Sequence, residues 1–175
     1  LSDYQKGFLH NPQPFIQYAK QKNIPIVVDP KGKDFTKYYG ATLLTPNRSE
    51  FEAIVGVAHS EEELIENAEQ LLNDLALEAL LITRSEEGMT LMQKNQPPFS
   101  IPAKAQDVYD VTGAGDTVIA TLVAMLAEDK PLTEATVIAN IAASIVVGKL
   151  GASQVSVHEL HQALAQQERA HHLVL

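Results

Sequence analysis

The residues best suited to chemistry form the string Asp-Val-Thr-Gly-Ala-Gly-Asp at positions 110–116, directly before an apolar segment. Glycines on both sides of Ala114 let the backbone turn tightly and approach a ligand, because no Cβ intervenes. The amides of Gly113, Ala114 and Gly115 are then expected to point outward at a helix N-terminus, where donors and the helix dipole favour a phosphate. Asp116 suits such a place if its carboxylate accepts the proton of a hydroxyl that attacks the phosphate. The alternative is that Asp116 only complements the helix dipole and that the glycines only form a turn.

The complete string, set at a loop-to-helix junction, resembles the signature of the ribokinase-like (PfkB) family of sugar and nucleoside kinases. This resemblance implies a carbohydrate kinase that uses ATP and Mg²⁺. It implies Asp116 as the general base, and the amides of Gly113, Ala114 and Gly115 as an anion hole for the phosphoryl group in transfer. Preorganised amides of this kind stabilise charge on the phosphoryl oxygens.

A second segment fits the same resemblance. Asn47-Arg48-Ser49-Glu50 resembles the family's Asn-x-x-Glu motif, which implies that these residues lie near the nucleotide and that Asn47 and Glu50 hold Mg²⁺ through water. Mg²⁺ keeps several of its waters, so few protein ligands are needed. Asn at a helix start with Glu three residues later is also typical of a capping box. Both roles can hold together.

Two further positions are expected to lie near the nucleotide. Thr83 to Gly88 stands where the family usually carries Thr-x-Gly-x-x-Gly, with Ser85 in place of the first glycine. The backbone there must either avoid positive φ or hold a non-glycine residue in strain. Asn140, inside an apolar helix, matches a position near the adenine, and the alternative is a hydrogen bond within the core.

Longer strings, at residues 1–7, 28–32, 40–47 and 147–151, resemble the heptose-7-phosphate kinase branch of the family. That branch phosphorylates the anomeric hydroxyl of D-glycero-β-D-manno-heptose 7-phosphate with ATP, for ADP-heptose and the lipopolysaccharide core. The implied partners are a sugar phosphate and ATP, with a homodimer in the full-length protein. Lys31 and Lys6 are candidate phosphate contacts, although solvated surface lysines are commoner. The alternatives are another ribokinase-like sugar kinase and a noncatalytic nucleotide-binding fragment.

Short β-rich runs alternate with amphipathic stretches along the chain, which predicts an α/β fold with a mostly parallel sheet. The resemblance implies a ribokinase-like three-layer α/β/α sandwich, C-terminal portion only. We expect one unit over residues 1–175, in which the helices at 116–128 and 133–147 are apolar nearly all round and therefore buried against the sheet. The predicted strands are 24–28, 41–45, 79–83 and 89–92, and the predicted helices are 12–22, 47–55, 60–73, 116–128, 133–147 and one that Ser156 opens.

Composition excludes several classes of protein. Thirteen Lys and Arg against 22 Asp and Glu give a formal charge of −9, which argues against nonspecific binding to nucleic acid or anionic lipid. No apolar run is long enough for a membrane span, since the run at 142–147 is short and is interrupted by Ser144, and no cysteine is present for thiolate chemistry. We therefore expect a cytoplasmic protein. The start at Leu1 suggests a piece of a larger frame, with the upstream part and its sugar lid absent. The histidines lack ligand-like spacing.

Overall fold

The computed structural model describes residues 1–4, 7, 9–104, 108–151 and 153–172, and the candidate Lys6 lies outside them. The chain divides into two compact units, Leu1–Ser100 and Ile101–Leu175. The sequence predicted one unit, because no long linker interrupts it. The boundary follows the short Pro-rich loop at residues 96–98, so a few residues suffice to separate the units.

The sheet has the strand order β1-β2-β3-β4-β5, with bounds Val27–Val28, Leu43–Leu44, Ala79–Thr83, Met89–Gln93 and Phe99–Ile101. β1 pairs with β2, and β2 with β3, in parallel. β4 runs antiparallel to β3, which a tight turn allows whereas a parallel pair would need a long crossover. The mostly parallel α/β sheet predicted from the sequence is confirmed, whereas β5 was not predicted.

β1 and β2 are shorter than predicted for a local reason. The amide of Ile26 donates to the Thr42 hydroxyl at 2.9 Å rather than to a strand carbonyl. At the other end, Pro30 and Pro46 lack the N–H that would extend the ladder. Each strand therefore keeps only its central, fully buried pair of residues in regular pairing.

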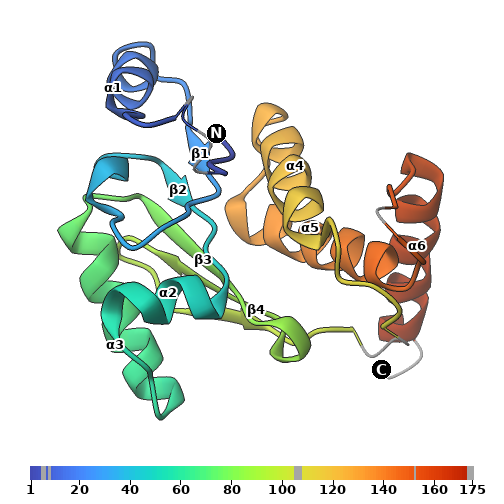
Figure 1. The fold of residues 1–175 in the computed structure, drawn as a ribbon. Coiled ribbons are helices and arrows are strands. Elements are labelled where there is room, and N and C mark those ends of the chain that lie inside the picture. The colour runs from blue at the N-terminus through green and yellow to red at the C-terminus, as the bar shows by residue number, and fades with distance from the viewer. Residues whose placement is uncertain (5–6, 8, 105–107, 152, 173–175) are drawn as a thin grey trace. The chain divides into compact units, whose positions relative to one another are not determined.

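The helices of the first unit agree closely with the prediction. α2 and α3 lie beside β3 and β4, while α1 lies near the start of the chain (Figure 1). Ser60 caps α3 by accepting the Glu63 amide at 3.1 Å, and Gly56 ends α2 with a φ of 96°. The bounds are Gln13–Gln21 for α1, Arg48–Val55 for α2 and Glu61–Asp74 for α3, with 3₁₀ turns at Thr36–Tyr38 (η1) and Ser85–Glu87 (η2).

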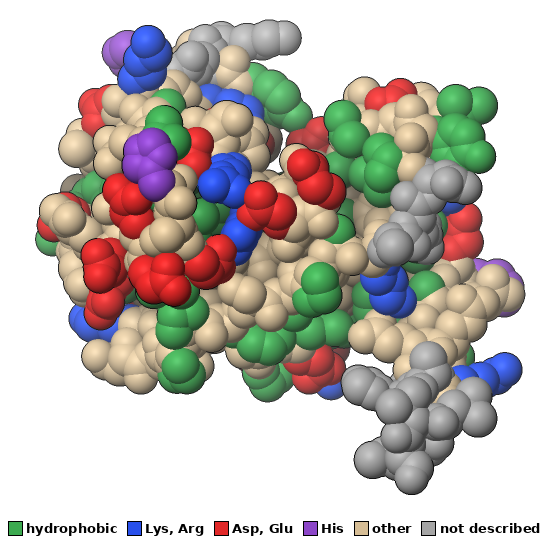
Figure 2. All heavy atoms as spheres, turned by 90° about the horizontal axis from the view of Figure 1, so that it is seen from below, with side chains coloured by type: hydrophobic (Ala, Val, Ile, Leu, Met, Phe, Trp, Pro, Cys, Tyr) green, Lys and Arg blue, Asp and Glu red, His purple; other side chains and the backbone are tan. Residues whose placement is uncertain are grey.

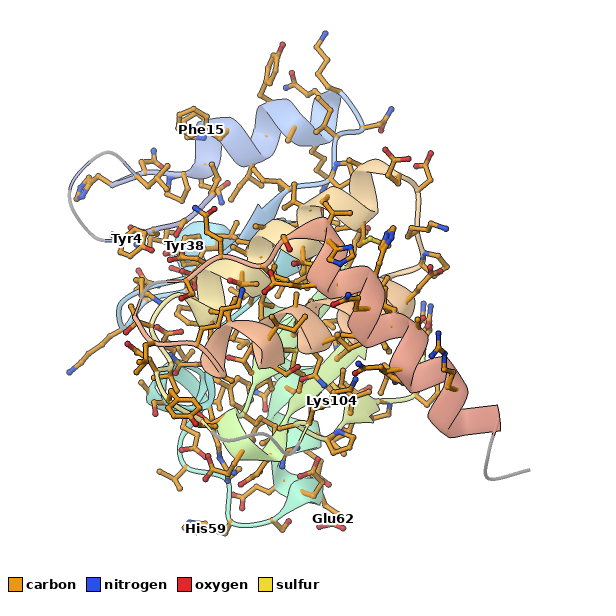
Figure 3. The ribbon with its side chains drawn as sticks, turned by 90° about the vertical axis from the view of Figure 1, so that its right-hand side faces the viewer. Tyr4, Phe15, Tyr38, His59, Glu62 and Lys104 are labelled. Atoms are coloured by element: carbon orange, nitrogen blue, oxygen red, sulfur yellow. The ribbon has the colours of Figure 1, made fainter. Side chains whose placement is uncertain are left out.

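Aromatic side chains close the core of the first unit around η1. Phe35 and Tyr38 meet edge to face with ring centroids 5.8 Å apart, and Tyr38 is fully buried. Its hydroxyl donates to Asp3 Oδ2 at 2.6 Å, so the buried polar tip is satisfied. Phe15, by contrast, projects from α1 (Figure 3) and is 45% exposed.

The second unit consists of α4 (Ala114–Ala127), α5 (Leu132–Val147) and α6 (Val157–His172). α5 is buried along most of its length, as predicted, and packs against α4. The prediction was wrong for α4, in which only Val118 and Leu122 are buried and Val123 is 48% exposed. An apolar composition records what a helix can bury, but not how many neighbours it has.

The opening of α6 confirms its predicted capping box. Ser156 and Glu159 exchange hydrogen bonds, with the Glu159 amide donating to Ser156 Oγ at 3.2 Å and the Ser156 amide to Glu159 Oε2 at 2.8 Å. Among the described residues, no helix combines the length and apolar character that a membrane crossing requires.

Candidate functional site

Gly113 starts α4 in a conformation that glycine alone adopts readily. Its φ of 83° and ψ of 0° place this N-cap residue in the left-handed region. Its carbonyl accepts both the amide and the hydroxyl of Thr117 at 2.9 Å. Upstream, Asp110 accepts the Thr112 amide at 2.8 Å, and hydrogen bonds from Thr112 lower the pKa of the Asp110 carboxyl. The loop before α4 is thus shaped by its own side chains.

The residues of this loop differ in hydrogen bonding and in exposure to solvent. The Ala114 amide donates back to the Val111 carbonyl at 3.2 Å, so it belongs to the turn in this conformation. Gly115 is exposed, and a Cβ added there meets nothing within 4 Å. Asp116 is also exposed in the first turn of α4. The helix start therefore presents a bare backbone stretch to solvent beside a carboxylate.

The first unit carries the other predicted motif at the start of α2. Asn47 Oδ1 accepts the Glu50 amide at 2.9 Å, and Glu50 Oε2 accepts the Asn47 amide at 2.9 Å. This reciprocal pair is the capping box that the spacing predicted. It fixes both side chains at the point where the chain leaves β2.

Lys31 joins this motif to the end of β1. Its ammonium donates to Glu50 Oε1 at 2.5 Å and to Asp29 Oδ1 at 3.3 Å. Burial raises the pKa of the Asp29 carboxyl, and Lys31 partly opposes that rise. For Lys31 itself burial acts to lower the pKa, but the bonds to Glu50 and Asp29 together raise it above its usual value. The lysine, predicted as a phosphate contact, is held here between two carboxylates.

These groups share one edge of the sheet. Asp29 follows β1, Asn47 follows β2, and Arg84 follows β3, so all stand at the carboxyl ends of the parallel strands. A bridge between Asn47 and Thr83 joins the motifs, with the Thr83 amide donating to the Pro46 carbonyl at 3.0 Å. Ligands of open α/β sheets bind at this edge.

The turn between β3 and β4 adopts the strained alternative that the sequence left open. Ser85, in place of a glycine, has a φ of 52°, and Gly88 has a φ of 90° and a ψ of −129°. The turn is closed by backbone bonds, from the Arg84 amide to the Gly88 carbonyl at 2.8 Å and from the Gly88 amide to the Ser85 carbonyl at 3.1 Å.

Charged side chains around this turn form a network that the sequence analysis missed. Glu87 accepts from Arg48 at 2.8 and 2.9 Å and from Arg84 at 3.0 Å. Arg84 also forms a forked pair with Glu61, with both bonds at 2.7 Å. Figure 2 shows acidic side chains gathered around basic ones on this face of the first unit. The mixed charges at 84–87 were the only signal, and charge runs are usually solvated.

Asn140 and the histidines lie outside the groups described so far. Asn140 is half-buried and donates to the Pro102 carbonyl at 3.0 Å, so its amide has a backbone partner. His158 contacts Gln162 at 2.9 Å and is exposed. The His59 amide, just before α3, donates to Glu63 Oε2 at 2.8 Å. Within the part of the chain that the structure describes, no group of His, Asp and Glu is arranged to hold a metal directly.

Water-mediated binding of Mg²⁺ is compatible with the Asn47–Glu50 pair. Each carboxylate oxygen of Glu50 already accepts one hydrogen bond, from Lys31 or from the Asn47 amide. A carboxylate oxygen has a second lone pair, which can accept a proton from a metal-bound water. Mg²⁺ typically keeps several waters, so the donor set fits a hydrated ion.

Comparisons with known proteins agree with this arrangement. The model of the pfkB family of carbohydrate kinases matches residues 13–159. The protein from Proteus mirabilis (strain HI4320) named Bifunctional protein HldE is 60% identical over 164 residues, which cover 94% of this chain and 35% of that protein. The protein of the same name from Hahella chejuensis (strain KCTC 2396) is 56% identical over 170 residues, covering 97% and 36%. The chain thus spans about a third of the length of these curated relatives.

Solved structures show the ribokinase-like fold that the motifs implied. Arabidopsis thaliana ribokinase, solved with ribose and ATP, superposes with a TM-score of 0.76 at 26% identity, over 85% of this chain and 51% of the other. Phosphofructokinase-2 from Escherichia coli, solved with fructose-6-phosphate, gives a TM-score of 0.78 over 94% and 54%, and at 18% identity it shows the fold alone.

Proposed function

The chain belongs to the pfkB family of carbohydrate kinases, and from this premise we propose that it carries out ATP-dependent phosphorylation of a sugar phosphate. The substrate we propose is D-glycero-β-D-manno-heptose 7-phosphate, phosphorylated on its anomeric hydroxyl, in the supply of ADP-heptose for lipopolysaccharide. The observation that carries the proposal is the start of α4, where Gly113 in a left-handed conformation precedes the exposed Gly115 and Asp116.

Asp116 is the proposed general base. Its carboxylate would take the proton of the anomeric hydroxyl as that oxygen forms a bond to the γ-phosphorus of ATP. The bond between the γ-phosphorus and the bridging oxygen breaks, and ADP leaves. A positioned base of this kind typically contributes about 10²–10⁴-fold to the rate.

The glycines of the same loop would support the phosphoryl group in transfer. The amides of Gly113, Ala114 and Gly115 are the proposed donors. The Ala114 amide would have to exchange its 3.2 Å bond with Val111, which is at the long end of the usual range, for one to a phosphoryl oxygen. The absence of a Cβ at Gly115 keeps the approach to the backbone clear.

The first unit supplies the proposed nucleotide and metal contacts. Asn47 and Glu50 would hold magnesium through its waters, and magnesium would neutralise charge on the phosphates. The other proposed nucleotide contacts are Arg48, Ser49, Thr83 and Gly88, all in the first unit. Asn140, in the second unit, is the last of them. Asn140 can contribute its side-chain oxygen to adenine, because its amide nitrogen donates to Pro102. Lys31 would act through Glu50 rather than on phosphate.

Nucleotide binding is tested on the chain itself. Isothermal titration with Mg·ATP should show binding that disappears when magnesium is chelated. Glu50→Gln should weaken the affinity for Mg·ATP more than Glu66→Gln, the same change at an exposed position of α3 outside the proposed site. Equal affinities for both variants and the unaltered chain would contradict the role of the Asn47–Glu50 pair.

The sugar is tested in a longer protein, because the chain spans about a third of its relatives. We would replace the matching segment of the Proteus mirabilis relative with this chain and measure ADP release. The proposal expects heptose 7-phosphate to be phosphorylated with a higher kcat/KM than fructose 6-phosphate or ribose. A preference for either of those would assign the chain to another sugar, and Mg·ATP binding without turnover would favour a noncatalytic nucleotide-binding role.

A further inference from the structure

The turn that follows β3 holds a serine in a backbone conformation that favours glycine. Ser85 has a φ of 52°, which is costly for a residue with a Cβ. Its neighbours Arg84 and Glu87 both form ion pairs, with each other and with other elements. Arg84 is only 11% exposed, although it stands beside a solvent-facing 3₁₀ turn. The two observations concern the same few residues.

Ion pairs close the turn from both ends. Arg84 precedes Ser85 and Glu87 follows it, and the guanidinium of Arg84 donates to Glu87 Oε2 from Nε at 3.0 Å and from Nη2 at 2.5 Å. These bonds join the two ends of the strained segment across Ser85. A planar guanidinium that donates along two directions restrains both the distance and the orientation of the carboxylate.

The same guanidinium is anchored to the body of the unit. Nη1 and Nη2 of Arg84 form a fork with Glu61 at the start of α3, with both bonds at 2.7 Å. Nη1 also donates at 2.9 Å to the hydroxyl of Thr90, which is fully buried in β4. The turn is therefore tied to α3 through Glu61 and to β4 through Thr90.

A second arginine reaches the turn from α2. Arg48, next to the capping residue Asn47, donates to both oxygens of Glu87 at 2.8 and 2.9 Å. The bonds from Arg84 first, and then the charge of Arg48, lower the pKa of Glu87, so this carboxylate is charged at neutral pH. Glu87 consequently links the turn to the segment proposed to hold magnesium.

We propose that Glu87, clamped between Arg48 and Arg84, is a positioning residue that holds the 83–88 turn in the glycine-like shape required for nucleotide binding. The part of this inference that concerns nucleotide rests on the proposed function. The clamp replaces the conformational freedom of the missing glycine, because ionic bonds across Ser85 offset its left-handed backbone. Glu87 acts through the turn and need not touch the nucleotide.

The proposal makes Glu87 and Ser85 interdependent. Removing the clamp should loosen the turn, and placing a glycine at position 85 should restore it, because glycine adopts positive φ without strain. If the two residues acted independently, Glu87→Gln would speed opening by the same factor beside Ser85 and beside Ser85→Gly, whereas the clamp predicts a smaller factor beside glycine. The penalty for a left-handed non-glycine residue corresponds to about a 5–30-fold change in an equilibrium constant.

Hydrogen exchange on the full chain tests the clamp without any ligand. The amides of Glu87 and Gly88 donate within the turn, at 3.0 and 3.1 Å, and report its opening. Glu87→Gln should speed their exchange about 5–30-fold, and the double variant Ser85→Gly/Glu87→Gln should return it toward the original rate. Glu86→Gln is the matched control, since Glu86 lies in the same turn and has no ion pair with a described residue.

Titration with Mg·ATP tests the link to nucleotide. Glu87→Gln should weaken the affinity by a similar factor, and the double variant should recover it. Equal exchange in Glu87→Gln and Glu86→Gln, or no rescue by glycine, would overturn the clamp. Altered exchange with unaltered affinity would overturn its role in binding. If the original chain does not bind Mg·ATP, the proposed function fails, and the exchange rates alone decide whether the clamp exists.

Discussion

Replacing Lys31 with methionine should destabilise the first unit by an amount that depends on pH. The substitution keeps most of the aliphatic stem and removes the ammonium that bridges Asp29 and Glu50. The side chains of these carboxylates are only 15% and 18% exposed, so water cannot fully replace the lost partner. Two neighbouring carboxylates would then face each other without a cation between them.

The expected loss of stability lies between the cost of breaking a fully buried ion pair and that of breaking an exposed one, because Lys31, Asp29 and Glu50 are partly buried. Breaking a fully buried ion pair by removing one partner costs about 3–5 kcal/mol, whereas exposed pairs contribute about 0–1 kcal/mol. Lys31 is 32% exposed and its partners are mostly buried, so we expect a loss of about 2 kcal/mol at neutral pH. For a chain of this size that corresponds to a fall of about 4–8 °C in the unfolding midpoint.

The sign of the pH dependence comes from Asp29. Its pKa in the folded protein lies above its ordinary value of 3.8, so the native state binds more protons than the unfolded chain in the window just above that value. Stability contributed by this group therefore falls as pH rises through the window. Removing Lys31 removes a group that lowers the pKa of Asp29, which widens the window upward. The cost of Lys31→Met should thus be largest near pH 7 and shrink toward pH 4.

Urea unfolding at a series of pH values measures this cost. Lys33→Met is the matched control, because Lys33 is exposed and has no ion pair with a described residue, so its unfolding free energy should change little. The double variant Asp29→Asn/Lys31→Met should recover part of the loss. A cost that is the same at pH 4 and pH 7, or equal to that of Lys33→Met, would refute the reasoning.

Other parts of the structure support further predictions. Gly113→Ala should lower the free energy of unfolding in urea by about 1–2 kcal/mol, because φ at Gly113 is 83°. Gly115→Ala should raise the free energy of unfolding by about 0.5–1 kcal/mol and still slow phosphoryl transfer, because it places a Cβ at the proposed phosphate site. A Gly115→Ala protein with the full kinase rate would contradict that placement. The bond from Lys149, and then those from Ser156, lower the pKa of Glu159 to about 2. The Lys149–Glu159 pair should therefore stabilise α6 above pH 4.5 and lose its effect as pH falls toward 2. In an NMR titration Lys149→Met should raise the pKa of Glu159, and an unchanged pKa would exclude the ion pair.

Local signals in the sequence predicted the elements that rest on local chemistry. The capping boxes at Asn47 and Ser156 and the glycine that ends α2 were all visible as short patterns, and the structure confirms them. β3 was predicted with its bounds, because five consecutive apolar and β-branched residues stand between polar ones. The strained turn at Ser85 was one of two stated alternatives.

Features that depend on partners distant in the chain could not be predicted from the sequence. The exposure of α4 depends on which helices pack against it, and its uniform apolar composition marks no particular face. Lys31 reaches Glu50 across 19 positions, and Arg48 reaches Glu87 across 39, so no short pattern reports either pair. β5 contains only Phe99–Ile101 and is too short to show a period. The roles of Asp116 and of the glycines before it remain predictions.

The most direct test of the phosphoryl-transfer mechanism is the rate of Asp116→Asn in the chimaera with the Proteus mirabilis relative. We would follow ATP and heptose 7-phosphate by ³¹P NMR, and measure Mg·ATP affinity on the same preparations. The variant should bind Mg·ATP as well as the unaltered protein and lose about 10²–10⁴-fold in turnover, because the proton acceptor is gone while the binding groups remain. An Asp116→Asn protein that turns over at the full rate would contradict the account.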